Sequence, residues 1–172
     1  MLLRLDGQSL VRRAVGRVID AGARPVVVVT GHEPDLLRTE LADVDCTFVH
    51  NPDFSGPTST SLHCALRALP ASTDAAVIVL GDMPRATTAM LQALIAAADE
   101  SDASLAVSRY GDVFAPPLLF RRSLFAELLA WHGEGCGKQV VMRHVNEAAI
   151  RDWPAAALFD VDTPDDYEGA SG

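Results

Sequence analysis

Aspartates in two short motifs are the residues of this chain best suited to hold a metal ion. Asp82 follows an uninterrupted apolar run, residues 75–80, and is itself followed by Met83 and Pro84. Such a run is typical of a strand buried on both faces of a parallel sheet. Because open α/β sheets bind ligands beyond the carboxyl ends of their strands, Asp82 is expected in a crevice, holding a cation such as Mg²⁺ against a polyphosphate. The structural alternative is an aspartate that only caps the next turn.

A second acidic motif, DVDTPDD, lies near the C-terminus. Asp160 and Asp162 alternate with Val161, so on extended backbone they face the same side. If that side lines the crevice, one of them joins Asp82 around a divalent cation. Two or three protein oxygens, completed by water and phosphate, are the usual shell of Mg²⁺.

Two loops offer polar groups beside these carboxylates. Residues 51–62 are rich in serine and threonine and precede a helix, whose N-terminus can bind an anion or the edge of a nucleobase. The alternative is that Ser59 or Ser61 only caps the helix. Lys138, the only lysine in the chain, follows a glycine-punctuated loop at residues 133–137. It is expected either to contact a phosphate or to be solvated.

The hydrophobic pattern alternates strands with helices, which predicts βαβ units and a mainly parallel sheet. Repeats, low-complexity tracts and linkers are lacking, so residues 1–172 are expected to form a single domain. The expected helices are residues 9–21, 34–41, 61–69, from 87 or 88 to beyond 95, 123–132 and 139–144. The expected strands are residues 25–30, 46–50, 75–80, 105–107, 118–120, 148–153 and 157–159.

Composition narrows the function class. The net charge is −9 and basic residues are scattered, which argues against nucleic acid as a partner. The chain has no apolar run long enough for a membrane span and no secretory signal. Its three cysteines form no CxxC pair, and its five histidines lack a metal-binding spacing, so a reduced, cytoplasmic protein is expected.

Taken together, the motifs resemble the MobA-like nucleotidyltransferase family, and within it the molybdenum cofactor cytidylyltransferases. The resemblance implies an α/β, Rossmann-like fold of the nucleotide-diphospho-sugar transferase type, with helices on both faces of the sheet. It also implies Mg²⁺-dependent transfer of CMP or GMP from CTP or GTP to a molybdopterin-type phosphorylated acceptor, with release of pyrophosphate. The matching stretches keep the family's order across essentially the whole chain: LLRLDGQSLVRRAV, PVVVVTG, NPDF with STSL, VIVLGDMP, PLLF, GEGCGK and DVDTPDD.

The resemblance also assigns roles to residues. Asp82 and Asp162, or less favourably Asp160, would hold Mg²⁺. A molybdoenzyme or its chaperone is the implied protein partner. The residues expected to bind substrate are Asn51, Ser59, Ser61, Gly81 and Lys138.

One departure from the family concerns the start of the chain. Family members open with a strand and a loop of the form LAAGxSxRMGxxK, and this chain begins where that loop would end. That loop holds the triphosphate, whose charge such enzymes must neutralise. Its strand belongs at the centre of the sheet, between residues 25–30 and 75–80, so both of these strands are expected to have an unpaired edge. The first strand is therefore expected to be missing, Met1 to be an internal start, and the chain to be less stable than a longer version.

Two other functions remain open. A catalytically silent module that binds a nucleotide, a pterin or a partner enzyme would explain the absent loop. A sugar-1-phosphate nucleotidyltransferase would share the fold and the metal site and differ in its acceptor pocket.

Overall fold

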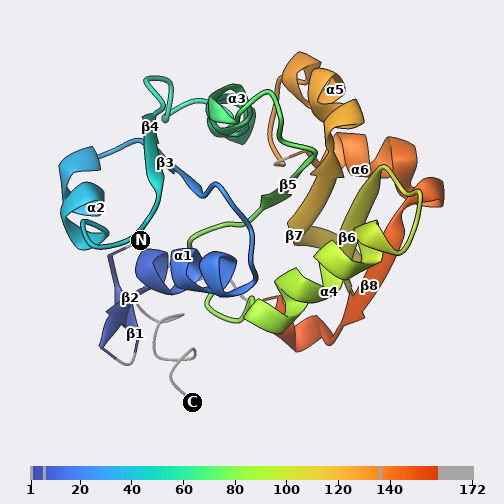
Figure 1. Cartoon of the computed structure of the whole chain (residues 1–172), viewed down its shortest axis with the longest axis horizontal. Coiled ribbons are helices and arrows are strands. Elements are labelled where there is room, and N and C mark those ends of the chain that lie inside the picture. Colours follow the sequence, from blue (N-terminus) through green and yellow to red (C-terminus); the bar gives the residue numbers. More distant parts are fainter. Residues whose placement is uncertain (1, 6, 136, 159–172) are drawn as a thin grey trace.

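Within the described residues, the strands form two main sheets that do not join. The computed structural model describes residues 2–5, 7–135 and 137–158 (Figure 1). In the smaller sheet, β3 (Val27–Thr30) runs parallel to β4 (Thr47–His50). The larger sheet has the order β5-β7-β6-β8. Its strands are β5 (Ala75–Ile78), β6 (Leu105–Tyr110), β7 (Val113–Arg121) and β8 (Ala149–Trp153), and a short hairpin of β1 (Arg4–Leu5) and β2 (Gln8–Ser9) precedes both sheets.

Side-chain caps mark the starts of two helices, α1 and α4. Ser9 caps α1 by accepting a hydrogen bond from the Arg12 N–H, and Thr87 caps α4 in the same way through Met90. None of the helices in the described residues is long and apolar enough to cross a membrane. The helices are α1 (Leu10–Asp20), α2 (Pro34–Glu40), α3 (Thr58–Ala68), α4 (Thr88–Asp99), α5 (Phe125–Ala130) and α6 (Lys138–His144), with 3-10 turns η1 (Arg122–Leu124), η2 (Val145–Glu147) and η3 (Ala155–Ala157).

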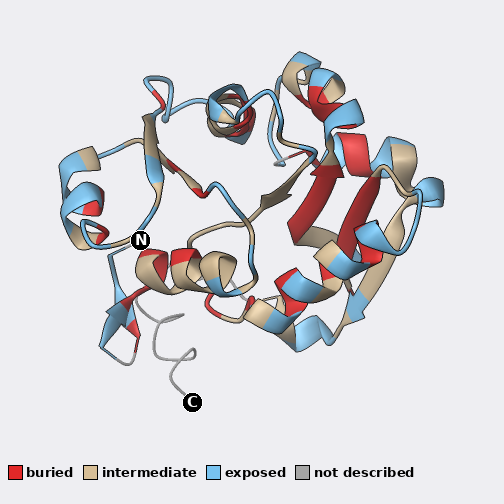
Figure 2. Cartoon of the chain, in the orientation of Figure 1, coloured by how far each residue is buried: buried red, intermediate tan, exposed pale blue. Residues whose placement is uncertain are grey.

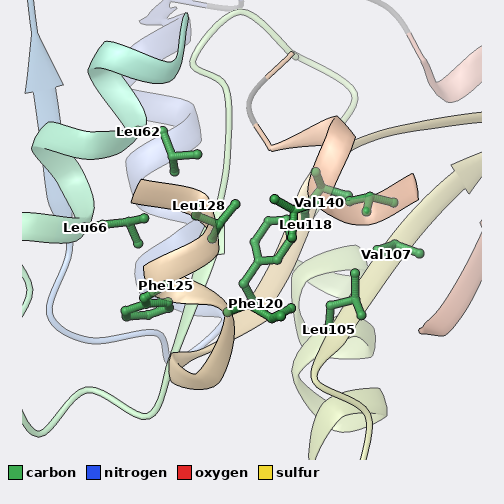
Figure 3. Packing of buried hydrophobic residues seen from close by; sticks show 11 residues of the cluster. Leu62, Leu66, Leu105, Val107, Leu118, Phe120, Phe125, Leu128 and Val140 are labelled. Atoms are coloured by element: carbon green, nitrogen blue, oxygen red, sulfur yellow. The ribbon is translucent and has the colours of Figure 1, made fainter. Parts of the chain in front are cut away.

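The larger sheet is covered by helices on both faces, because its central strands each contain a run of three buried apolar residues, Leu105–Val107 in β6 and Leu118–Phe120 in β7. Leu105 and Val107 of β6 pack toward α3, α5 and α6, whereas Ala106 between them packs toward α4. Figure 2 shows the buried residues gathered on these central strands. In Figure 3, Phe120 of β7 lies among Leu118, Leu128 and Val140.

The smaller sheet has its own apolar cluster. Val26 and Val28 of the β3 segment pack with Val11 and Val15 of α1 and with Leu41 at the end of α2. The expected class, α/β with helices on both faces, is therefore confirmed, and so is the expected gap, since β3 and β5 are end strands of separate sheets.

Three local predictions need correction. Residues 75–80 do not form a strand buried in a parallel sheet: β5 ends at Ile78, pairs antiparallel with β7, and is only half-buried. The sheet is accordingly more mixed than expected, with β6–β8 parallel and β6–β7 antiparallel. The third helix begins at Thr58 rather than at residue 61, so Ser59 and Ser61 lie inside it. Ala157 belongs to the turn η3 instead of a strand.

Candidate active site

Asp82 lies in the loop that leaves β5, where the carboxyl end of the strand opens the site. Its side chain is half-buried, and its Oδ1 atom is buried with no hydrogen-bond partner among the residues that the structure describes. Buried polar atoms in folded proteins almost always have a partner. A buried carboxylate oxygen that receives no hydrogen bond is suited to coordinate a cation, because the cation balances its negative charge.

The loop around Asp82 is fixed by contacts from distant parts of the chain. Arg17 of α1 donates to the Pro84 carbonyl oxygen at 2.8 Å, and Arg85 donates to the Ala156 carbonyl oxygen at 2.6 Å. Burial beneath the loop lowers the pKa of Arg17, with the neighbouring Arg13 adding to the effect. These contacts hold the carboxylate in place before any ligand arrives.

Asn51 holds the serine-rich loop against α3. Its side chain is 1% exposed and directly follows β4. Its amide nitrogen donates to the hydroxyls of Thr60 and Ser61, at 2.9 and 3.0 Å, and its amide oxygen accepts from the Asp53 N–H at 3.0 Å. All polar groups of the side chain except one lone pair are thereby engaged within the protein.

The N-terminus of α3 is bound to the glycine-punctuated loop. Ser59 and Gly133 exchange two hydrogen bonds, from the Gly133 N–H to the Ser59 hydroxyl at 3.0 Å and from the Ser59 N–H to the Gly133 carbonyl at 3.1 Å. The Thr58 hydroxyl accepts from the Gly135 N–H at 2.9 Å, and the Thr58 N–H donates to the Glu134 carboxylate at 3.2 Å. Glu134 thus places a negative charge where the helix would otherwise receive an anionic ligand.

Close packing explains why this loop ends in a glycine. Gly137 has a φ of +87°, and a Cβ atom there would come within 2.9 Å of Leu128 Cδ2 and 3.3 Å of Phe120 Cζ. Lys138 follows as the first residue of α6, with an exposed side chain and an N–H that donates to the Gly135 carbonyl at 2.7 Å.

The structure therefore brings several of the predicted site residues together. At the start of α3, Asn51 donates to the Ser61 hydroxyl and Ser59 is bonded to the glycine loop, and Gly81 lines the same cavity as Ser61. The Lys138 N–H is bonded to the same glycine loop. Asp160 and Asp162 lie outside the described residues, although the Arg85 contact fixes Ala156, four positions before Asp160, beside the Asp82 loop.

No group of three metal-ligating side chains occurs among the residues that the structure describes. Within that part of the chain, Asp82 is the candidate ligand that fits a cation.

Sequence reasoning missed three residues of this site. Arg17 and Arg85 hold the Asp82 loop by donating to backbone carbonyl oxygens. No sequence motif predicts such contacts. Glu134 lies between Gly133 and Gly135, and this GEG pattern indicates a loop. The structure shows that the loop contacts the start of α3 through Glu134.

Comparisons with known proteins agree with the architecture described above. Residues 1–148 match the MobA-like NTP transferase domain. The chain belongs to this family. A solved structure shares the Rossmann-type α/β fold of this chain: the crystal structure of Rv0371c from Mycobacterium tuberculosis H37Rv superposes with a TM-score of 0.84 at 25% identity, covering 98% of this chain and 86% of that one. The predicted family and fold type are confirmed.

Curated relatives align over part of the chain. The bifunctional protein GlmU of Francisella philomiragia is 34% identical over 106 residues, which are 61% of this chain and 23% of that protein. The purine catabolism protein PucB of Bacillus subtilis is 32% identical over 97 residues, 55% of this chain and 46% of the relative. The aligned region thus spans less than half of the length of either relative.

Proposed function

We propose that this chain is a Mg²⁺-dependent nucleotidyltransferase that transfers CMP or GMP from the triphosphate to a molybdopterin-type phosphorylated acceptor. The observation that carries the proposal is the buried, unpartnered Oδ1 of Asp82, held at the carboxyl end of β5 by a fixed loop. Membership in the MobA-like NTP transferase family supports the reaction class. An acceptor phosphate oxygen forms the new bond to the α-phosphorus as the bond to pyrophosphate breaks.

Asp82 and Asp162 are the proposed metal ligands, with Asp160 as the other candidate for the second position. Divalent cations neutralise charge on the transferring phosphoryl group. A second structure of the mycobacterial neighbour, at 24% identity, is titled as a complex with manganese, which supports a divalent metal for this chain as well. The Arg85–Ala156 contact supports the pairing, because it holds the segment that leads to both C-terminal aspartates near the Asp82 loop.

The serine-rich loop and the glycine loop are proposed to bind the base and the acceptor. Glu134 already provides a negative charge at the start of α3, so the Ser61 hydroxyl and the Gly81 backbone suit a nucleobase edge better than a phosphate. Asn51 and Ser59 are buried and bonded within the protein, and they are proposed to position these groups. Lys138 has an exposed side chain and is proposed to contact a phosphate.

The choice of nucleotide and acceptor draws on two fold neighbours. A CMP-2-keto-3-deoxy-manno-octonic acid synthetase, TM-score 0.76 at 12% identity, is titled as complexed with CTP. A molybdopterin-guanine dinucleotide biosynthesis protein A from Archaeoglobus fulgidus superposes with a TM-score of 0.61 at 17% identity. On this proposal the product passes to a molybdoenzyme or its chaperone.

The proposed location is the cytoplasm. Cys46 and Cys64 are free thiols, as is usual for proteins in that reducing compartment.

A catalytically silent binding module is the second candidate. The open space between β3 and β5 favours it, since an enzyme of this kind needs a rigid sheet behind its metal site. The two candidates differ in whether turnover depends on Asp82.

Asp82→Asn tests the proposal, with Asp112→Asn in the exposed β6–β7 turn as the matched control. Pyrophosphate release is measured with CTP and GTP, Mg²⁺ and either a molybdopterin-type or a sugar-1-phosphate acceptor. Calorimetry measures nucleotide binding with and without Mg²⁺. We expect Asp82→Asn to lower turnover by about 100-fold or more and to abolish the Mg²⁺ dependence of binding, while Asp112→Asn changes neither.

The other outcomes assign the remaining functions. Nucleotide binding without turnover in the unmutated chain indicates the silent module. Turnover with the sugar-1-phosphate acceptor but not with the molybdopterin-type acceptor indicates a sugar-1-phosphate nucleotidyltransferase. Turnover that is equal in Asp82→Asn and the unmutated chain contradicts the proposed metal site.

A further inference from the structure

Glu134 carries a carboxylate that the fold holds in place but does not neutralise. It lies in the loop between α5 and α6, beside the start of α3, and Figure 1 shows α3 and α5 as neighbours. Its Oε2 atom accepts from the Thr58 N–H at 3.2 Å. Gly133 is bonded to the Ser59 hydroxyl at 3.0 Å, and Gly135 is bonded to the Thr58 hydroxyl at 2.9 Å. The backbone on both sides of Glu134 is therefore anchored to α3.

The second carboxylate oxygen of Glu134 is open to a ligand. The side chain is exposed, and within the described part of the chain Oε1 receives no hydrogen bond and no cationic side chain pairs with the carboxylate. Each carboxylate oxygen has two lone pairs, so Oε2 can accept a second hydrogen bond beside that from Thr58. The two oxygens together can therefore accept from two adjacent N–H groups of one ligand.

Ser61 adds a donor one helical turn further along α3. Its half-buried hydroxyl accepts from the Asn51 amide at 3.0 Å and donates to none of the residues that the structure describes. Its proton is thus free to meet a ligand acceptor. Because positions three apart on a helix are surface neighbours, about 5–6 Å between Cβ atoms, Ser61 lies beside Thr58, to which Glu134 is bonded. The start of α3 presents two acceptor oxygens with one donor next to them.

This arrangement matches one edge of a 2-amino-4-oxopyrimidine ring. Such a ring presents, in order, an amino group, a ring N–H and a carbonyl oxygen. The carboxylate accepts from the first two groups, and the Ser61 hydroxyl donates to the third. Cytosine presents an amino group followed by two acceptors, and a carboxylate repels an acceptor placed against it. The edge therefore suits the 2-amino-4-oxopyrimidine ring and not cytosine.

We propose that Glu134 and Ser61 bind the 2-amino-4-oxopyrimidine ring of a substrate and that Glu134 determines the specificity for this ring. The guanine of a nucleotide and the pterin of a molybdopterin-type acceptor both contain it. The site deepens the proposed transferase function and rests on that function for its natural ligand. Its binding preference is measurable without metal or turnover.

Calorimetric titration of the full chain with two matched pairs of ligands tests this site. Pterin and GMP carry the 2-amino group, whereas lumazine and XMP have a carbonyl oxygen in its place. We expect pterin to bind about tenfold or more tightly than lumazine, because lumazine turns an acceptor toward the carboxylate. A preference in the pterin pair assigns the site to the acceptor, and one in the GMP pair alone assigns it to the nucleotide. A preference in neither pair overturns the proposal.

Glu134→Gln is expected to reverse the preference. The glutamine oxygen keeps the Thr58 N–H and accepts from the ring N–H, while the glutamine NH₂ group donates to the 2-carbonyl oxygen and repels a 2-amino group. We expect the 2-amino ligand to bind about tenfold or more weakly than to the unmutated chain, and the 2-oxo ligand to become the tighter of its pair. If Glu134 only holds α3 in place, both ligands weaken equally, and that result overturns the proposal.

Two further variants complete the test. Glu147→Gln, at an exposed carboxylate of η2, is the matched control and should leave both preferences unchanged. Ser61→Ala removes the donor to the carbonyl oxygen that pterin and lumazine share, so it should weaken both by about threefold or more. Circular dichroism checks that the variants retain their helices. A Ser61→Ala variant that binds pterin as tightly as the unmutated chain overturns the proposed contact of Ser61.

Binding and turnover separate this ring site from the proposed transferase activity. Turnover that depends on Asp82, with no preference in either ligand pair, overturns the ring site and supports the transferase. A preference that Glu134→Gln reverses, in a chain without turnover, supports the ring site and contradicts the transferase.

Discussion

The carboxylates of Glu127 and Asp82 differ in their hydrogen bonding, and this difference distinguishes a structural contact from a candidate ligand site. Glu127 of α5 is fully paired: its Oε2 lies 2.8 Å from His144 Nε2, and its Oε1 accepts from Arg143 at 2.9 Å. Asp82 has one buried oxygen that no hydrogen-bond donor in the described part of the chain contacts. Arg143 already balances the charge of Glu127, whereas the buried oxygen of Asp82 suits a metal ion.

The pairing of Glu127 predicts a pH dependence of stability. The hydrogen bond from His144, and then that from Arg143, hold the pKa of Glu127 below its usual value of 4.5. A carboxylate with a depressed folded-state pKa stabilises the protein above its unfolded pKa, and this contribution is lost as the pH falls through the folded value.

Glu127→Gln is therefore expected to lower the free energy of unfolding by about 1 kcal/mol or less at neutral pH, since water screens a side chain that is 27% exposed. The difference from the unmutated chain should shrink as the pH falls below 4.5. Urea denaturation at a series of pH values measures it. Asp53→Asn, at an exposed side chain, is the control, and a gap that widens on acidification contradicts the assignment.

At the scale of elements, the site depends on how α3 and the glycine loop are joined. Ser59 is 2% exposed and accepts the Gly133 N–H, and the neighbouring Thr58 accepts the N–H of Gly135. The loop also leads directly into Lys138 at the start of α6. Any change at this junction is therefore transmitted to α3, the glycine loop and α6 together.

Ser59→Ala removes the acceptor of the part-buried Gly133 N–H. We expect it to lower the free energy of unfolding by about 1 kcal/mol, because that N–H loses its protein partner. Ser55→Ala, in the exposed part of the same loop, should leave stability within about 0.5 kcal/mol of the unmutated chain. Urea denaturation of both variants decides the matter. Equal effects of the two substitutions would show that the junction contributes nothing specific.

At the scale of the whole molecule, the division into two sheets sets the stability of its parts. β3 and β5 have the composition of central strands and the position of end strands, with residues of β5 only half-buried. A strand with one unpaired edge has backbone groups that depend on solvent or on a ligand.

This division predicts an alternating exchange pattern in the unliganded chain. The amides of Val27, Val29, Ala75 and Val77 should exchange faster than those of Val28 and Ala76, which face their paired strands. Residue-resolved hydrogen exchange measures the difference. Uniform protection along β3 and β5 would show that the two edges are already paired in solution.

The sequence by itself determined the features that depend on near neighbours in the chain. Ser9 and Thr87 each cap a helix through a residue three positions away, so the starts of α1 and α4 were readable directly. The apolar run before Asp82 placed that carboxylate at the end of a strand, and the order of motifs indicated the family and the gap between β3 and β5. Short-range hydrogen bonds and hydrophobic periodicity carry this information.

Only the tertiary structure decided the features that join distant segments. The Ser59–Gly133 bond spans 74 positions, and the Arg17 contact that fixes the Asp82 loop spans 67. The antiparallel pairing of β5 with β7 likewise depends on which strand reaches its edge. No local pattern encodes such partners, because their contact energies arise only once the chain has packed and excluded water from the groups involved.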